Sequence, residues 1–299
     1  MQPLRAAEVY FMRFTKMHGI GNDYVYVNCF EEELPTDPAR LSELVSDRHF
    51  GIGSDGLILI KPSEEADFAM DIYNADGSRA MMCGNGIRCV AKYVYDHGMT
   101  NVTTFRIETL AGIKEVDLTV KDGTVRLVSV DMGLPKLLSG GQELELSPDV
   151  YVGCRKLPNR GVWEQLDVHG CAKEMIAISM GNPHAVFYME ALDGLDIASI
   201  GPFIEKHPRF PDRTNVEFVQ VIDRENIIMR VWERGSGETM ACGTGACASA
   251  VATMLAGFGD DTINVRLLGG TLSIRRDEST GHVIMTGPAT EVFRGDFDV

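Results

Sequence analysis

The sequence predicts an α/β (α+β) protein built from two similar units. Strand-like and helix-like runs alternate along the 299 residues, a length that favours two domains of ordinary size. The second half repeats features of the first with residue numbers that differ by 159, as between Cys83 and Cys242. An internal duplication is the simplest explanation, and it implies two units related by a rough two-fold axis.

The first unit is predicted to consist mainly of strands from Met12 onward, and the residues before Met12 show no clear pattern. Apolar runs predict the strands, and turn residues such as Gly, Asn and Asp separate them. The predicted strands cover residues 12–19, 24–30, 57–61, 67–74, 103–110, 114–120 and 125–133.

Two helices are predicted between these strands. The first lies near residues 37–49, with Thr36 or Asp37 as its N-cap and an apolar face made by Leu41, Leu44 and Val45. The second follows Cys83 and ends at Gly98, a typical glycine at a helix C-terminus. Its apolar residues have the i, i+3, i+4, i+7 spacing of one helix face: Ile87, Val90, Ala91 and Val94.

The second unit shows the same features in the same order. A helix with apolar residues at helical spacing follows Cys242, and a strand-like run at residues 227–235 corresponds to residues 69–77. Residues 131–142 are rich in Gly and Leu and form the predicted linker, so the predicted domains are residues 1–130 and 131–287. The identities that relate the two halves are Met81 and Met240, Gly84 and Gly243, Gly86 and Gly245, Ala91 and Ala250, and Gly98 and Gly257.

Composition excludes several classes of protein. The net charge of −15 argues against general nucleic-acid binding, which depends on Lys and Arg. No apolar run approaches the ~20 residues that span a bilayer, and the start of the chain lacks the pattern of a secretory signal. We therefore expect a cytoplasmic protein that binds neither nucleic acid nor membrane.

The cysteine content points to thiols and not to disulfides. The chain has seven cysteines, and an odd number without a secretory signal opposes a disulfide framework. Since free Cys is among the most buried residue types, five of them are expected to be core residues: Cys29, Cys89, Cys154, Cys171 and Cys247. Zinc binding is not predicted, because the pairs Cys83/Cys89 and Cys242/Cys247 lack the usual ligand spacing.

Cys83 and Cys242 differ from the other cysteines because each precedes a Gly-x-Gly turn at a predicted helix start. A helix N-terminus carries N–H groups without intrahelical partners and a partial positive charge. A Cys there can ionise below its free pKa of ~8.5, and the same N–H groups can bind a carboxylate. Each half therefore offers a thiol beside an anion site.

Two such sites facing one ligand predict a two-base reaction. A carboxylate would bridge the two helix starts, with its α-carbon between the sulfurs. One thiolate would remove the α-proton while the opposite thiol donates a proton to the other face, which is racemisation or epimerisation. The helix ends would stabilise the enolate-like charge, and no cofactor is required.

Six segments of the chain resemble the diaminopimelate epimerase family, an enzyme family of the lysine and peptidoglycan route. They span Lys16 to Ala248: KMHGIGNDYVYVN, DRHFGIGSDGLILI, YNADGSRAMMCGNGIRC, MGNPHAV, TNVEF and ERGSGETMACGTGACA. The resemblance implies that LL- and meso-diaminopimelate are interconverted without pyridoxal phosphate. It also implies two pseudo-symmetric domains, each a curved mixed sheet around a central helix, with the active site in the cleft between them. Residues 288–299 are expected to return to the first domain as a strand, and a homodimer is expected.

The family's site residues carry over onto matching positions. The resemblance implies two catalytic cysteines, Cys83 and Cys242, with His184 beside the reacting centre. Glu233 would bind a substrate ammonium group or tune a thiol, and Arg234 would bind the distal carboxylate. The residues expected to hold the reacting carboxylate or to line the pocket are Gly84, Asn85, Gly243, Thr244, Asn22, Asn74, Asn182 and Asn215. Some relatives have Gln where this chain has Gly56, so that contact would be absent.

Other interpretations of the same residues stay open at this point. A proline racemase-like enzyme would use the same thiol pair on a cyclic amino acid. A thiol switch would instead join Cys83 and Cys242 in a disulfide. Asn22, Asn182 and Asn215 are also typical turn residues. The GxGxxG match at residues 51–56 is expected to be a turn, because a strand follows it and not a helix.

Overall fold

The computed structural model describes residues 11–156 and 162–298. Two compact units account for the described chain, and the first comprises residues 11–19, 23–116 and 289–298. The second comprises residues 20–22 and 117–288. The division into domains at residues 130 and 288 remains a prediction.

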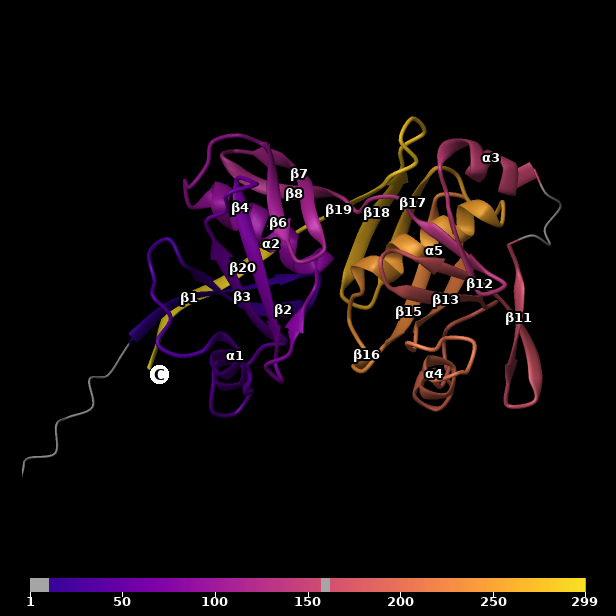
Figure 1. Cartoon of the computed structure of the whole chain (residues 1–299), viewed down its shortest axis with the longest axis horizontal. Coiled ribbons are helices and arrows are strands. Elements are labelled where there is room, and N and C mark those ends of the chain that lie inside the picture. The colour runs from indigo at the N-terminus through magenta and orange to yellow at the C-terminus, as the bar shows by residue number, and fades with distance from the viewer. Residues whose placement is uncertain (1–10, 157–161, 299) are drawn as a thin grey trace, which may run out of the picture. The chain divides into compact units, whose positions relative to one another are not determined.

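The first unit contains two α-helices among its strands (Figure 1). Its elements are β1 (Phe11–Gly19), β2 (Asn22–Asn28), α1 (Pro38–Ser46), β3 (Gly56–Lys61), β4 (Phe68–Asn74), β5 (Arg79–Ala80), α2 (Gly84–Asp96), β6 (Thr104–Thr109), β7 (Gly112–Lys121), which continues past the boundary of the unit, and β20 (Thr290–Asp298).

The second unit repeats this order with additions. Its elements are β8 (Thr124–Asp131), β9 (Lys136–Ser139), β10 (Gln142–Glu145), α3 (Pro148–Lys156), β11 (Glu164–Val168), β12 (Cys171–Ser179), β13 (Pro183–Tyr188), α4 (Ile197–Glu205), β14 (Asn215–Val221), β15 (Asn226–Glu233), β16 (Gly237–Glu238), α5 (Gly243–Leu255), β17 (Thr262–Leu267), β18 (Gly270–Arg276) and β19 (Val283–Gly287).

The structure confirms the internal duplication down to the register of the strands. Both pairs of helices keep the offset of 159 at both ends, α1 with α4 and α2 with α5. In the first unit β2 and β3 are parallel, β3 and β4 antiparallel, and β4 and β6 parallel. The second unit repeats these orientations in β13–β14, β14–β15 and β15–β17. The pairs Leu57–Tyr73 and Val216–Trp232 occupy the same place in the two registers.

Each sheet curves around one buried helix, as predicted. In the second unit α5 contacts β12, β13, β14, β15, β17, β18 and β19 (Figure 1). Every residue of α5 except Thr244 is buried, and most of its side chains are small, so strands pack against it on all sides. In the first unit α2 contacts β1 and β20, and its predicted apolar face is fully buried.

A second helix covers the other face of each sheet. In the first unit α1 packs on β3 and β4, and Leu41 and Val45 join a core with residues of β1, β2 and β3. Asp37 caps α1 by accepting hydrogen bonds from the N–H groups of Ala39 and Arg40, which confirms one of the two predicted caps. Asp196 caps α4 in the same way, although the sequence analysis missed this helix.

The structure can be compared with three further expectations: the linker, the returning strand and the GxGxxG match. The predicted linker at residues 131–142 is wrong, because β9 pairs with β10 and with β12 inside the second unit. The strand β20 pairs antiparallel with β1 along nearly all of its length, so the last residues of the chain complete the first unit. Residues 51–55 are an irregular connection before β3, so a strand and not a helix follows the GxGxxG match, as expected.

Gly201 gives a direct test of the packing between α4 and the sheet. A methyl group at Gly201 would lie 2.4 Å from Cγ of Trp232 on β15. Helix propensity alone predicts that Gly201→Ala stabilises α4 by about 1 kcal/mol. We expect the opposite sign, a loss of about 1–3 kcal/mol in urea unfolding, because overpacking dominates. A more stable variant would show that this contact does not constrain the helix.

Candidate active site

Both predicted thiols lie at the N-caps of the central helices. Cys83 caps α2 and Cys242 caps α5, each with extended backbone dihedrals. The sulfur of Cys83 accepts a hydrogen bond from the Gly86 N–H at 3.3 Å, and Cys242 accepts one from the Gly245 N–H at the same distance. The two sulfurs therefore occupy equivalent positions, one in each unit.

The glycines in these turns leave room for strand side chains beside the sulfurs. A methyl group at Gly86 would lie 2.6 Å from Cδ1 of Ile58 and 3.5 Å from the Cys83 sulfur. A methyl group at Gly245 would lie 2.7 Å from Oε1 of Glu217 and 3.2 Å from the Cys242 sulfur. Only glycine lets the helix start approach these strand side chains closely.

Cys242 lies in a buried and electronegative environment. Burial raises the pKa of the Cys242 thiol well above its ordinary value, and the carboxylates of Glu233 and Glu217 raise it further. Hydrogen bonds from the Thr244 hydroxyl and the Gly245 N–H oppose these effects without reversing them. The expectation that a helix start lowers the pKa is therefore wrong for Cys242, because desolvation and two carboxylates outweigh the helix end.

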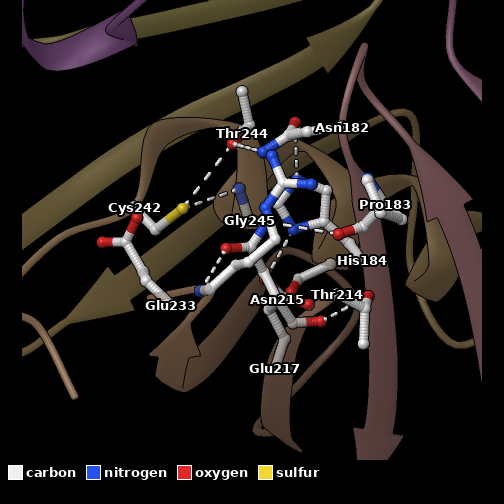
Figure 2. A network of polar contacts seen from close by, with 12 residues as sticks. Asn182, Pro183, His184, Thr214, Asn215, Glu217, Glu233, Cys242, Thr244 and Gly245 are labelled. Carbon is white, nitrogen blue, oxygen red and sulfur yellow. Dashed lines mark hydrogen bonds and ion pairs between the residues drawn. The ribbon is translucent and has the colours of Figure 1, made fainter. Parts of the chain in front are cut away.

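A chain of polar contacts leads from Cys242 into the core of the second unit (Figure 2). The Thr244 hydroxyl lies 3.6 Å from the Cys242 sulfur and 3.4 Å from the Asn182 amide nitrogen. Asn182 Oδ1 contacts His184 Nε2 at 3.0 Å, and His184 Nδ1 contacts Glu217 Oε1 at 2.6 Å. The structure thus brings three predicted residues, Asn182, His184 and Thr244, together with the thiol.

Glu217 belongs to this network, and the sequence analysis did not select it. Its side chain and that of His184 are fully buried, and burial raises the pKa of the Glu217 carboxyl although His184 partly offsets this. Its second oxygen, Oε2, has no hydrogen-bond partner among the described residues. The strand period could have identified Glu217, because residues 215 and 217 of β14 face the same side of the sheet.

Three more predicted residues surround the C-terminal end of β15. Asn215 accepts a hydrogen bond from the Arg234 N–H at 2.9 Å through its side chain and donates one to the Pro183 carbonyl at 3.2 Å. The guanidinium of Arg234 is exposed and donates to the carbonyl of Asp212. Glu233 accepts a hydrogen bond from the Thr239 hydroxyl, and burial raises its pKa. Glu233 and Arg234 therefore end a strand directly beside the thiol network.

The predicted site residues of the first unit lie at the start of α2 and at the end of β4. Gly84 and Asn85 form the first turn of α2, as predicted for a carboxylate site. Asn74 ends β4, donates a hydrogen bond to the Ser78 hydroxyl at 3.0 Å, and corresponds to Glu233 of the second unit. Gly243 begins α5 as Gly84 begins α2.

Asn22 and Gly56 lie in constrained positions. Residues 20–22 group with the second unit, where Gly21 lies against Met240, two residues before Cys242. A methyl group at Gly56 would lie 2.1 Å from the carbonyl oxygen of Tyr73 on the paired strand. A Gln at position 56 therefore has no space with this backbone.

The remaining cysteines follow the buried expectation only in part. Cys89 and Cys247 are fully buried, whereas Cys29 is half-buried and Cys171 is exposed, so the expectation for Cys171 is wrong. The side chain of Cys154 lies outside the described residues.

Within the part of the chain that the structure describes, no cluster of three or more His, Cys, Asp or Glu side chains is arranged to hold a metal ion. No described helix is long and apolar enough to cross a bilayer.

Comparison with known proteins agrees with this geometry. The family model described as diaminopimelate epimerase matches residues 14–138 and 176–292. A diaminopimelate epimerase of Acetivibrio thermocellus is 54% identical over 288 residues, which cover 96% of this chain and 99% of the relative. The chain belongs to the diaminopimelate epimerase family.

Further comparisons place this family member in a wider fold. A diaminopimelate epimerase of Agathobacter rectalis is 53% identical over 289 residues, with 96% of this chain and all of the relative covered. A solved hydroxyproline epimerase of Agrobacterium vitis, with bound trans-4-hydroxy-L-proline, has 16% identity and a TM-score of 0.67. It covers 97% of this chain and 93% of its own, so the two-domain fold extends beyond the family.

The environment of Cys242 predicts how this thiol titrates. Because burial and carboxylates raise its pKa, the thiolate should form only well above pH ~8.5, the ordinary midpoint. Glu233→Gln removes a negative charge and should lower the midpoint. Cysteine-selective ¹³C labelling and Cβ chemical shifts measure this titration. Glu238→Gln, which removes an exposed carboxylate paired with Arg230, is the matched control and should leave the midpoint unchanged. A wild-type midpoint below pH 8 would contradict the prediction.

Proposed function

We propose that this protein interconverts LL- and meso-diaminopimelate by proton transfer at the α-carbon, with Cys83 and Cys242 as the two bases. The observation that carries the proposal is the pair of cysteines at equivalent helix starts in a member of this family. Each sulfur accepts one N–H group of its own turn, and helix N-termini favour a bound carboxylate.

The reaction balances within the thiol pair and the substrate. A thiolate sulfur takes the α-proton while the electron pair of the C–H bond moves into the carboxylate and forms an enolate-like intermediate. The opposite thiol then gives its proton to the other face of the α-carbon and becomes the thiolate. The configuration at the α-carbon is inverted, and the sulfur that began as the thiolate now carries a proton. Donors at the two helix starts stabilise the intermediate, because the negative charge develops on the carboxylate.

Different polar residues of the two units are proposed to bind different groups of the substrate. Thr244 and the first turn of α5 hold the reacting carboxylate together with Gly84 and Asn85 of α2. Arg234, with an exposed guanidinium, binds the distal carboxylate in a bidentate manner. Glu233 binds an ammonium group, and the pocket is completed by a set of amide side chains: Asn22, Asn74, Asn182 and Asn215.

The raised pKa of Cys242 supports a role for this residue as the proton donor of the resting enzyme. His184 acts on the donor through Asn182 and Thr244, which orient the hydroxyl that lies 3.6 Å from the sulfur. A general acid must keep its proton at the working pH, and burial beside two carboxylates favours the protonated form.

We also propose that the protein is a cytoplasmic homodimer that acts on a small molecule. The support is an apolar surface on β1 and β20, where Phe11, Val292 and Phe293 are 61%, 54% and 46% exposed. Among the described residues β20 pairs with β1, which leaves its second edge for another strand in the proposed dimer.

Single substitutions test the two-base assignment. We expect Cys83→Ala and Cys242→Ala each to reduce epimerisation by roughly 10²- to 10⁴-fold, because each removes one proton carrier. The measurement is conversion of LL-diaminopimelate to the meso isomer in deuterated water, with deuterium at the α-carbon followed by mass spectrometry.

The matched controls for this test are Cys89→Ala and Cys247→Ala, two fully buried cysteines in the same helices. Both controls should retain turnover if they fold. Normal turnover in either variant at Cys83 or Cys242 would overturn the assignment. Racemisation of proline by the wild-type protein without activity on diaminopimelate would overturn the substrate and favour a proline racemase-like activity.

A charge on the outer surface of β20 tests the proposed dimer. Val292→Glu places a carboxylate on an exposed apolar position and should convert a dimer into a monomer, as measured by light scattering after size exclusion. Thr290→Glu, an exposed polar position on the same strand, serves as the control. A monomeric wild-type protein would contradict the proposed dimer and leave the proposed reaction unaffected.

A further inference from the structure

The two helix starts have the same geometry and different charges. The sulfurs of Cys83 and Cys242 cap equivalent helices through equivalent N–H groups. A duplication alone would give the two thiols similar acidity. The side chains around the two turns differ, however, and the differences are in the charged groups.

Arg88 is an ionisable residue that hydrogen-bonds to the first turn of α2. It lies on α2 five residues after Cys83, and its side chain is fully buried. Nη1 donates to the Gly84 carbonyl and Nη2 donates to Asn85 Oδ1, both at 3.0 Å. A guanidinium keeps its charge at any working pH, so these two hydrogen bonds place a permanent positive charge at the carbonyl of Gly84, the residue that follows Cys83.

The second turn has no cation at the corresponding position. Cys247 takes the place of Arg88, and it is an uncharged buried thiol. Two carboxylates lie nearby instead, Glu217 and Glu233, where the first unit has Ile58 and Asn74. Ile58 and Glu217 are true structural equivalents, because each is the side chain that a methyl group at the turn glycine, Gly86 or Gly245, would strike first.

We propose that Arg88 is a positioning residue that holds Cys83 as the thiolate of the resting pair and leaves the proton on Cys242. This inference rests on the proposed two-base function. The guanidinium stabilises negative charge at the first helix start, whereas the carboxylates of the second unit oppose it. The same two hydrogen bonds fix Asn85 and the Gly84 peptide, which are proposed to hold the substrate carboxylate.

The other titratable groups around the two thiols agree with this assignment. On the side of Cys83, Tyr26 and Cys89 are buried, and burial raises the pKa of both, so neither adds a negative charge at neutral pH. On the side of Cys242, the facing groups are Glu233 on β15, Glu217 on β14 and His184 on β13. Glu217 contacts His184 and Glu233 accepts a hydrogen bond from Thr239, and both carboxylates oppose negative charge on the Cys242 sulfur.

The test compares the titration midpoints of both thiols in wild type, Arg88→Gln and Arg88→Lys. Cysteine-selective ¹³C labelling reports each midpoint from its Cβ chemical shift, with assignments from Cys83→Ala and Cys242→Ala. We expect Cys83 to titrate at lower pH than Cys242 in the wild type. Arg88→Gln should raise the midpoint of Cys83 by about one pH unit or more, because an opposite charge is lost. Arg88→Lys should restore most of the shift.

Lys92→Met is the matched control, since it removes a cation one turn further along α2 that is paired with Asp96. It should leave the midpoint of Cys83 unchanged. An unchanged Cys83 midpoint in Arg88→Gln would overturn the proposal. A loss of helix in both Arg88 variants without a shift of the Cys83 midpoint would also overturn it. If neither variant folds, the order of the wild-type midpoints decides: Cys242 below Cys83 would overturn the proposal.

The readout separates this inference from the proposed function. Titration midpoints are measured without substrate, so an inactive protein with the expected midpoints would overturn the epimerase proposal alone. An active enzyme in which the Cys83 midpoint does not change when Arg88 is replaced by Gln would overturn the role of Arg88 alone. In an active enzyme, Arg88→Gln should also move the acidic limb of the pH profile of kcat/KM upward by the same amount.

Discussion

The hydrogen bond from a helix N–H to a cysteine sulfur is the contact on which both candidate half-sites depend. It makes each sulfur the N-cap of a buried helix, so the thiol has a fixed position relative to the first turn. Glycine at residues 86 and 245 suits this position, because a methyl group there would lie 2.6 Å from the end of the Ile58 side chain or 2.7 Å from the end of the Glu217 side chain. The sheets that curve around α2 and α5 then hold these helix starts in place, and this explains why each unit buries its helix almost completely.

Burial has opposite consequences for structure and for chemistry. It stabilises α5, whose small side chains pack against seven strands. It also removes water from Cys242 and raises the pKa of that thiol, and two carboxylates add to the effect. The network through Thr244, Asn182 and His184 supplies hydrogen bonds that partly compensate. A helix N-terminus is therefore one contribution among several, and in the second unit it is smaller than desolvation.

The duplication allowed the two units to keep one backbone and acquire different electrostatics. Strand register, helix ends and turn glycines are the same in both, whereas residues at equivalent positions differ in charge. Asn74 corresponds to Glu233, and Ile58 corresponds to Glu217. Such a difference gives the single proton of a thiol/thiolate pair a preferred sulfur, whereas identical environments would give none.

The sequence by itself determined the family, the duplication, the two thiols at helix starts and the starts of both central helices, because these follow from local patterns: a repeated Cys-Gly-x-Gly turn and apolar residues at helical spacing. Only the tertiary structure decided the acidity of Cys242, the role of Glu217 and the burial of Arg88, since each depends on neighbours distant along the chain. Helix α4 was missed because its apolar and small residues, including Pro202 and Gly201, lack a clear helical pattern. The predicted linker failed for the same reason, because β9 is a strand through its pairing with β12.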